Sequence, residues 1–286
     1  MAVIIVCIGL VLAGLVAVGR WGRLAVEPPR VAGAEGGGVG DPPPVGLVVR
    51  RYLWAVNLAV AAGAAAGVMA AGAGGRLVMR LLAATSGDAA QGRVTEASEV
   101  VGRITVEGTV AFFIFTGLFF GAASGGAYLL VRRWLPAGRA GGLAYGALLL
   151  VLAGTRLDPL REANPDFDLV GPGWLSVLAF SVLVLFHGML VAALAGRLSR
   201  AVPLLARDPR AVAGHAPLLL LAPLLPVVVA LTVIGALVVL ATRARPLVAA
   251  WHAPRLRLAG QAVLALAALV ALPGFVAGVA GILGRG

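Results

Sequence analysis

Residues 174–194, WLSVLAFSVLVLFHGMLVAAL, are an unbroken apolar stretch that decides the fold class. A helix needs about 20 apolar residues to cross the hydrocarbon core of a bilayer. The stretch has that length, His187 is its only ionisable side chain, and it begins with Trp174, a residue type common at membrane interfaces. It therefore predicts a membrane-spanning helix.

Six further segments have similar apolar character. Together with 174–194 they predict an all-α, polytopic transmembrane helix bundle with about seven spans. Ala140–Thr155 is the shortest and contains several glycines, so a short or re-entrant helix is expected there. The six segments are Ala2–Gly19, Tyr52–Ala73, Thr109–Leu130, Ala140–Thr155, Ala216–Thr242 and Leu258–Ile282.

The composition agrees with a membrane protein and excludes an ordinary soluble domain. Of the 286 residues 60% are hydrophobic and 12% are charged, whereas soluble domains are about half apolar and a quarter charged. The net charge of +11 lies mostly between the apolar segments, which favours membrane topology over nucleic-acid binding. All 23 basic residues are arginine, which with the alanine, glycine and valine excess indicates a GC-rich bacterial genome and hence a bacterial cell membrane. The single cysteine, Cys7, excludes an intrachain disulfide.

The pattern divides the chain into three parts. Residues 1–19 are expected to be an N-terminal transmembrane anchor, and residues 52–286 a six-helix body. Between them, residues 20–51 read as a cytoplasmic linker, because their proline and glycine runs favour extended or disordered chain.

Arginine counts give an orientation. With the N-terminus outside, the inner connections carry thirteen arginines and the outer ones ten. Because arginine is enriched in cytoplasmic loops, this predicts an outer N-terminus and an inner C-terminus. The extracytoplasmic segments are then 76–107 and 156–173. The loop 243–257, with four arginines, lies outside in this arrangement and opposes the rule.

Glycines spaced by four residues recur in the expected spans. Such spacing flattens one helix face and lets another backbone approach closely. We expect these glycines to pack helices within the chain; homodimerisation or contact with a partner membrane subunit is the alternative. The residues are Gly63, Gly67, Gly117, Gly121, Gly125, Gly142, Gly146, Gly274 and Gly278.

His187 lies in the middle of its span. The simpler hypothesis is a neutral histidine that hydrogen-bonds a neighbouring helix. The alternative pairs it with Ser124 of Ala123-Ser124-Gly125-Gly126. A serine before glycine on one helix, followed by His-Gly two helices later, resembles the Ser–His dyad of rhomboid-type intramembrane proteases. The resemblance implies a serine nucleophile and a histidine base. Ala122 stands where that family has glycine, and no His-x-x-x-Asn motif supplies an oxyanion donor.

Two charged groups are further candidates. Arg76 and Arg80 share one helix face and suit lipid headgroups or an anionic ligand, although snorkelling explains them equally well. The acidic residues of 156–173 are of the type that binds Ca²⁺ or Mg²⁺, but they lack EF-hand spacing, so ion pairs with arginines are the simpler explanation. These acids are Asp158, Glu162, Asp166 and Asp168.

The motifs needed for common enzymatic chemistry are missing from the sequence. It has no P-loop, no His-Glu-x-x-His and no dinucleotide-binding glycine motif, and no cofactor is expected. The sequence therefore favours a non-enzymatic subunit, scaffold or regulator of a membrane assembly, with the lipid bilayer as its first partner. One alternative is a small-solute transporter or channel with helices kinked at Pro223, Pro226 and Pro273. The other is a serine hydrolase using Ser124 and His187.

Overall fold

The computed structural model describes residues 1–29, 44–157, 159–224 and 254–285, which fold as helices joined by loops. Within these ranges, five helical runs are long and apolar enough to cross a membrane. They are Ala2–Trp21, Val45–Thr85, Val106–Trp134, Gly173–Ala201 and Pro254–Leu283. The all-helical fold is thereby confirmed, and the five apolar runs are compatible with a membrane location.

Two of the long runs contain a wider π-helical turn. The first joins α2, η1 and α3, and the second joins α4, η3 and α5. The remaining helices are simple, and three short 3-10 turns lie in the loops. The elements are α1 (Ala2–Trp21), α2 (Val45–Ala66), η1 (Gly67–Gly74), α3 (Gly75–Thr85), η2 (Asp88–Ala90), α4 (Val106–Phe112), η3 (Phe113–Phe120), α5 (Gly121–Val131), η4 (Arg132–Trp134), α6 (Gly138–Ala153), η5 (Pro165–Asp168), α7 (Gly173–Ala201), α8 (Pro209–Ala213), η6 (Ala216–Leu224) and α11 (Pro254–Leu283).

The span count of about seven is not confirmed. Five long runs are present, and α6, with 16 residues, is the short helix expected at Ala140–Thr155. The segment Ala216–Thr242 begins as the 3-10 helix η6, which contains Pro223, and its remainder with Pro226 lies outside the described residues. α11 continues through Pro273 as one helix.

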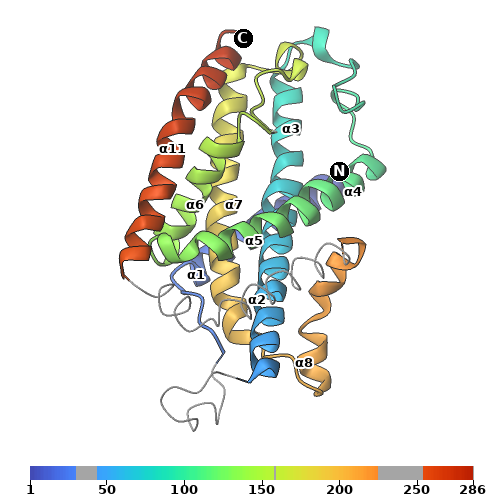
Figure 1. Ribbon diagram of the computed structural model, residues 1–286. Coiled ribbons are helices and arrows are strands. Elements are labelled where there is room, and N and C mark those ends of the chain that lie inside the picture. Colours follow the sequence, from blue (N-terminus) through green and yellow to red (C-terminus); the bar gives the residue numbers. More distant parts are fainter. Residues whose placement is uncertain (30–43, 158, 225–253, 286) are drawn as a thin grey trace.

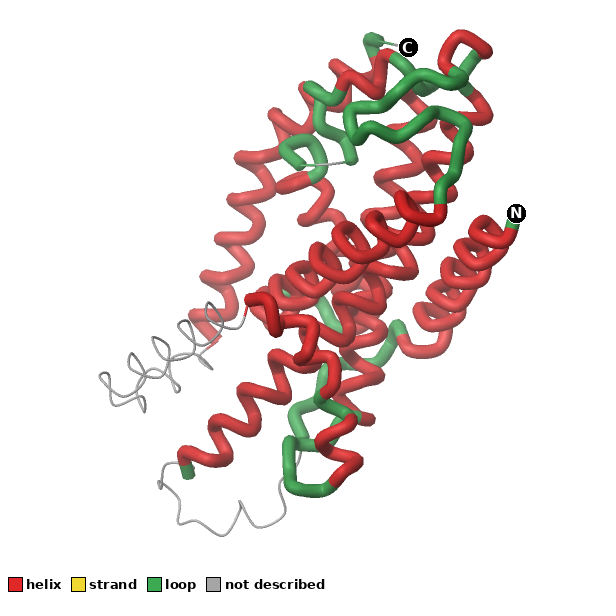
Figure 2. Tube along the Cα trace, turned by 90° about the vertical axis from the view of Figure 1, so that its right-hand side faces the viewer, coloured by secondary structure: helices red, strands yellow, loops and turns green. Residues whose placement is uncertain are grey.

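The bundle has two ends with different loops (Figures 1 and 2). We call one the cap end; it carries the loops 86–105 and 154–172 and the last described residues. The other, the arginine end, carries the connections 22–29, 132–137 and 202–215. Helices α6 and α7 run antiparallel between these ends, and the run from α4 to α5 crosses them obliquely in Figure 1.

The first helix shares the core of the bundle. α1 packs against η1 and α7. Cys7 and Ala17 are buried on it, and Gly14 lies against the side chains of Phe186 and Leu190. The sequence predicted residues 1–19 as an anchor separate from the rest of the bundle. In the structure this helix packs against the other helices.

The C-terminal end of α11 lies at the cap end. Gly278 packs against Thr155, and Arg285 pairs with Asp168 at 3.9 Å. The beginning of α11 lies against Trp134, because Gly260 contacts its indole. The C-terminal residues thus share an end with the segment 156–173, whereas the sequence placed them on opposite sides of the membrane.

This placement of α11 sharpens the charge asymmetry. Among the described residues, thirteen arginines and two acids lie in the arginine-end half, and seven arginines and seven acids lie in the cap-end half. Arg255 and Arg257, at the start of α11, belong to the arginine end. They are part of the loop 243–257 that opposed the positive-inside rule in the seven-span arrangement, and at the arginine end they no longer oppose it.

Candidate functional site

Three polar side chains from three helices meet inside the bundle. Ser124 comes from α5, Tyr145 from α6 and His187 from α7. The Oγ atom of Ser124 lies 2.9 Å from Nε2 of His187 and 3.1 Å from the hydroxyl of Tyr145. The Tyr145 hydroxyl also donates to the backbone carbonyl of Ser124 at 2.6 Å. We call these residues the Ser–Tyr–His cluster.

Glycines allow the three helices to come this close. Gly125, next to Ser124, packs on α2, where a Cβ would lie 2.8 Å from Cα of Gly63. Gly188, next to His187, packs on α6, where a Cβ would overlap the backbone of Gly142 and Gly146. The glycine faces therefore fix the positions of both the serine and the histidine.

The glycine motifs are used within the chain. The run from α2 to η1 packs on the run from η3 to α5 through Gly63, Gly67, Gly117, Gly121 and Gly125. Gly142 and Gly146 receive α7, as described above. On α11, Gly278 contacts Thr155, whereas Gly274 has only the guanidinium of Arg156 near it, at 4.0 Å.

The proton positions in the cluster follow from its donors and acceptors. The hydroxyl of Tyr145 donates its proton to the backbone carbonyl of Ser124. Nδ1 of His187 is buried, and within the described chain it has no hydrogen bond, although the backbone of Ala66 interacts with the ring. We assign the ring proton to Nδ1, so that Nε2 accepts from the Ser124 hydroxyl.

This arrangement has one feature of a catalytic dyad and lacks another. A hydroxyl that donates to a neutral imidazole is the geometry of an activated nucleophile. An acyl-transfer site also needs N–H donors aimed at the developing oxyanion. The N–H groups of Gly125 and Gly126, next to the serine, lie inside α5, where helical N–H groups bond to carbonyls one turn earlier.

The candidate ligand arginines on α3 contact the chain itself. Nη2 of Arg76 lies 3.7 Å from Glu99, and its guanidinium stacks 5.0 Å from the Phe112 ring centroid. Arg80 donates to the carbonyl of Gly102 at 3.0 Å. Both residues thereby fasten the loop 86–105 to α3.

The acidic loop residues are distributed over the cap. Asp166 accepts from the backbone of Glu96, Asp168 pairs with Arg285, and Glu162 contacts Gly281. Asp158 lies outside the described residues. In the described ranges, no three His, Cys, Asp or Glu side chains come together as a metal-binding group. The acids thus connect the two cap-end loops and α11.

The sequence missed Tyr145 as a member of the cluster. Its aromatic ring is 2% exposed and packs edge-on against Tyr128, with ring centroids 5.2 Å apart. The available signal was its position beside Gly146, on the face of α6 that approaches another helix. No family model, curated protein or solved structure matches the chain.

Proposed function

We propose that this chain is a non-enzymatic subunit or scaffold of a bacterial membrane assembly. The proposal rests on one observation: polar side chains inside the bundle hydrogen-bond to one another across helices. The Ser–Tyr–His cluster joins α5, α6 and α7 through hydrogen bonds of 2.6–3.1 Å. Buried polar side chains of this kind hold membrane helices together.

The geometry around the cluster supports a structural role. Close packing leaves no room for a methyl group on either Gly125 or Gly188. The helical N–H groups beside Ser124 are committed to α5, so the serine has no adjacent oxyanion donors. A scaffold needs fixed helices rather than a reacting centre, and these contacts provide fixed helices.

The charge distribution supports an orientation. Thirteen of the described arginines, with two acids, lie in the arginine-end half. Because cytoplasmic loops are rich in arginine, we place this end in the cytoplasm. The cap end, with the loops 86–105 and 154–172 and Arg285, then faces the outside, and α1 runs from the N-terminus toward the cytoplasmic end, where Gly22 lies against Arg139. This keeps the expected outer N-terminus and moves the C-terminal residues to the same side.

Purification of the full chain tests the scaffold proposal. The tagged chain is extracted from its native membrane in mild detergent, and its mass is measured together with the proteins bound to it. We expect one partner, or a second copy, in fixed stoichiometry, and the same composition for Ser124→Ala because chemistry is not required. A chain that purifies alone as a monomer at every detergent concentration overturns the proposal.

The distance between Ser124 and His187 favours one second candidate, an intramembrane serine hydrolase. In that case Oγ attacks an acyl carbon while Nε2 takes its proton. The tetrahedral intermediate then expels the leaving group, which takes the proton from the imidazolium, and water releases the acyl group from the serine by the same route.

A fluorophosphonate probe distinguishes the two candidates, because it reacts covalently with activated serines. Under the scaffold proposal the full chain in detergent is not labelled. Labelling that Ser124→Ala and His187→Ala abolish, and that Ser181→Ala leaves unchanged, would replace the scaffold with the hydrolase. Ser181 is a suitable control because it lies on α7 away from the cluster.

A further inference from the structure

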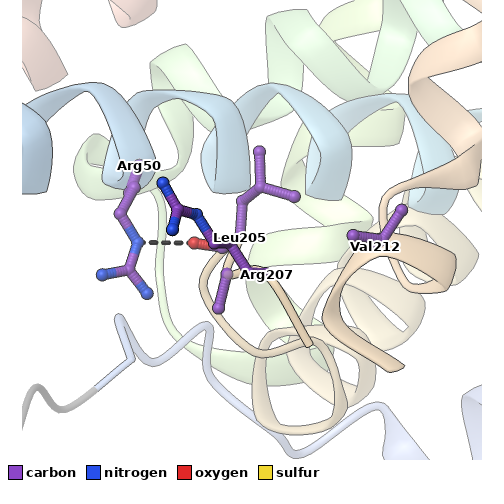
Figure 3. A pocket seen from close by; sticks show the side chains of 5 residues that line it. Arg50, Leu205, Arg207 and Val212 are labelled. Atoms are coloured by element: carbon purple, nitrogen blue, oxygen red, sulfur yellow. Dashed lines mark hydrogen bonds between the residues drawn. The ribbon is translucent and has the colours of Figure 1, made fainter. Parts of the chain in front are cut away.

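An open cavity of about 590 Å³ lies at the arginine end, between the beginning of α2 and the segment 202–212 (Figure 3). Two of the residues that line it are arginines and none is acidic. The lining residues are Arg50, Leu205, Ala206, Arg207 and Val212. We call this space the Arg50–Arg207 cavity.

The guanidinium of Arg50 is held in one orientation. Its Nε donates to the backbone carbonyl of Leu205 at 2.5 Å, as the dashed line in Figure 3 shows. Within the described chain the two terminal nitrogens have no protein partner. A guanidinium fixed at Nε presents its other two nitrogens as a fork, which suits two oxygens of one phosphate.

The second arginine adds a cation without a counter-ion. Arg207 is exposed and makes no hydrogen bond or ion pair with any described residue. The nearest acid in sequence, Asp208, accepts a hydrogen bond from the backbone N–H of Ala211 at 3.1 Å and caps α8. Figure 3 shows both guanidinium groups on the same side of Leu205. The cavity therefore has an excess of positive charge.

The surroundings place the cavity at the edge of an apolar span. Val48 and Val49 on α2 are 46% and 49% exposed, so apolar surface flanks Arg50. Two residues after Arg50, Tyr52 is 39% exposed, whereas the indole of Trp54 is buried and donates to the carbonyl of Val202 at 3.0 Å. Aromatic residues with a polar edge are typical of the headgroup layer of a bilayer.

We propose that the Arg50–Arg207 cavity binds the phosphate of an anionic membrane lipid. Arg50 holds two phosphate oxygens through its fork, and Arg207 supplies the second positive charge. Leu205, Ala206 and Val212 contact the glycerol and the first carbons of the acyl chains. The mixture of cations and apolar side chains at headgroup depth favours a lipid over a soluble phosphate compound.

Lipid binding to the purified full chain tests the proposal. The chain is prepared in an uncharged detergent, and melting temperature and bound mass are measured with four additives. These are phosphatidylglycerol, phosphatidylcholine, glycerol phosphate and inorganic phosphate. We expect only phosphatidylglycerol to stay bound and raise the melting temperature. Arg207→Gln should weaken this binding about tenfold, the equivalent of one lost charge-assisted contact.

Matched variants keep the test decisive. Arg93→Gln removes the same charge from the cap end and should leave lipid binding unchanged. Arg50→Lys keeps the charge but loses the fork, and should weaken binding as Arg207→Gln does. If Arg50 variants fail to fold, Arg207→Gln still decides, because its side chain has no hydrogen bond or ion pair with another described residue to lose.

Three outcomes overturn the proposal. The first is Arg207→Gln binding phosphatidylglycerol as the unmodified chain does, which leaves the arginines as snorkelling groups only. The second is an equal melting shift with inorganic phosphate or glycerol phosphate, which assigns the cavity to a soluble ligand. The third is equal loss of lipid with Arg93→Gln, which means that net charge and not this cavity holds the lipid.

Discussion

Gly63 on α2 and Gly125 on α5 are in direct backbone contact. A Cβ on Gly63 would lie 2.8 Å from Cα of Gly125, and a Cβ on Gly125 would lie 2.8 Å from Cα of Gly63. Carbon atoms without a bond between them prefer about 3.5–4.0 Å. The two backbones therefore approach as closely as glycine allows, and this contact sets where α5 presents Ser124.

The first prediction follows from this contact. Gly125→Ala should destabilise the folded chain by about 1–3 kcal/mol, because the methyl group overlaps backbone atoms that cannot rotate away. The measurement is unfolding of the purified chain by titration with a denaturing detergent.

The neighbouring glycine supplies the control. A Cβ on Gly126 would meet nothing within 4 Å. Gly126→Ala should therefore be neutral or stabilise the helix by up to about 1 kcal/mol. Equal loss of stability in the two variants would contradict a role for the α2–α5 contact.

The second prediction concerns coupling in the Ser–Tyr–His cluster. Ser124→Ala, His187→Ala and the double variant form a cycle whose interaction free energy isolates the 2.9 Å contact. Interhelical hydrogen bonds in membranes contribute about 0.6 kcal/mol on average and up to about 1.7 kcal/mol. We expect a value in this range from detergent unfolding. Strict additivity of the two single variants would show that the contact contributes nothing.

The sequence offered the Ser124–His187 contact as the alternative hypothesis and did not identify Tyr145 as the third member. Ser124 and His187 were paired because a serine before glycine, followed by His-Gly two helices later, resembles the dyad of rhomboid-type proteases. Tyr145 also precedes a glycine, Gly146, but it has no counterpart in that resemblance. Its role depends on which face of α6 meets α5, and that face is set by the packing of Gly142 and Gly146 on α7.

The glycine spacing predicted close packing without identifying the partners. Gly67 meets Gly117 and Gly121, but nothing in the spacing distinguishes this pairing from one with α7 or with a second copy. Pairing follows from the crossing direction of α4 to α5, which depends on the loop 86–105. That loop is tied to α3 by Arg76 and Arg80, for which the sequence suggested lipid headgroups, an anionic ligand or snorkelling.

The third prediction compares two arginines that hold the cap. Arg76 is 11% exposed in its side chain, lies 3.7 Å from Glu99 and stacks on Phe112. Arg76→Ala should cost about 2 kcal/mol, because it removes the stack and leaves Glu99 without its partner.

The more exposed arginine is the matched case. Arg161 pairs with Glu96, with side chains 32% and 45% exposed. Arg161→Ala should cost less than about 1 kcal/mol, and the loss should shrink as salt is added. Unfolding at low and high salt measures both. A larger cost for Arg161→Ala would mean that the cap is held mainly from the loop 154–172.

The fourth prediction tests the orientation through the C-terminal residues, where sequence and structure differ. Arg285 pairs with Asp168, so both lie at the cap end, whereas the seven-span arrangement separates them by the whole membrane. The experiment uses three variants on a Cys7→Ala background. Each has one new cysteine, at Glu96, Ala206 or Arg285. Intact cells or spheroplasts are then treated with a maleimide that does not cross membranes. With the arginine end in the cytoplasm, Glu96→Cys and Arg285→Cys should react at once, and Ala206→Cys only after permeabilisation.

Reaction of Glu96→Cys without Arg285→Cys would restore the seven-span arrangement. The reverse pattern, with only Ala206→Cys reacting, would invert the orientation while keeping the fold, because the shared end of Glu96 and Arg285 is independent of which side of the membrane it faces.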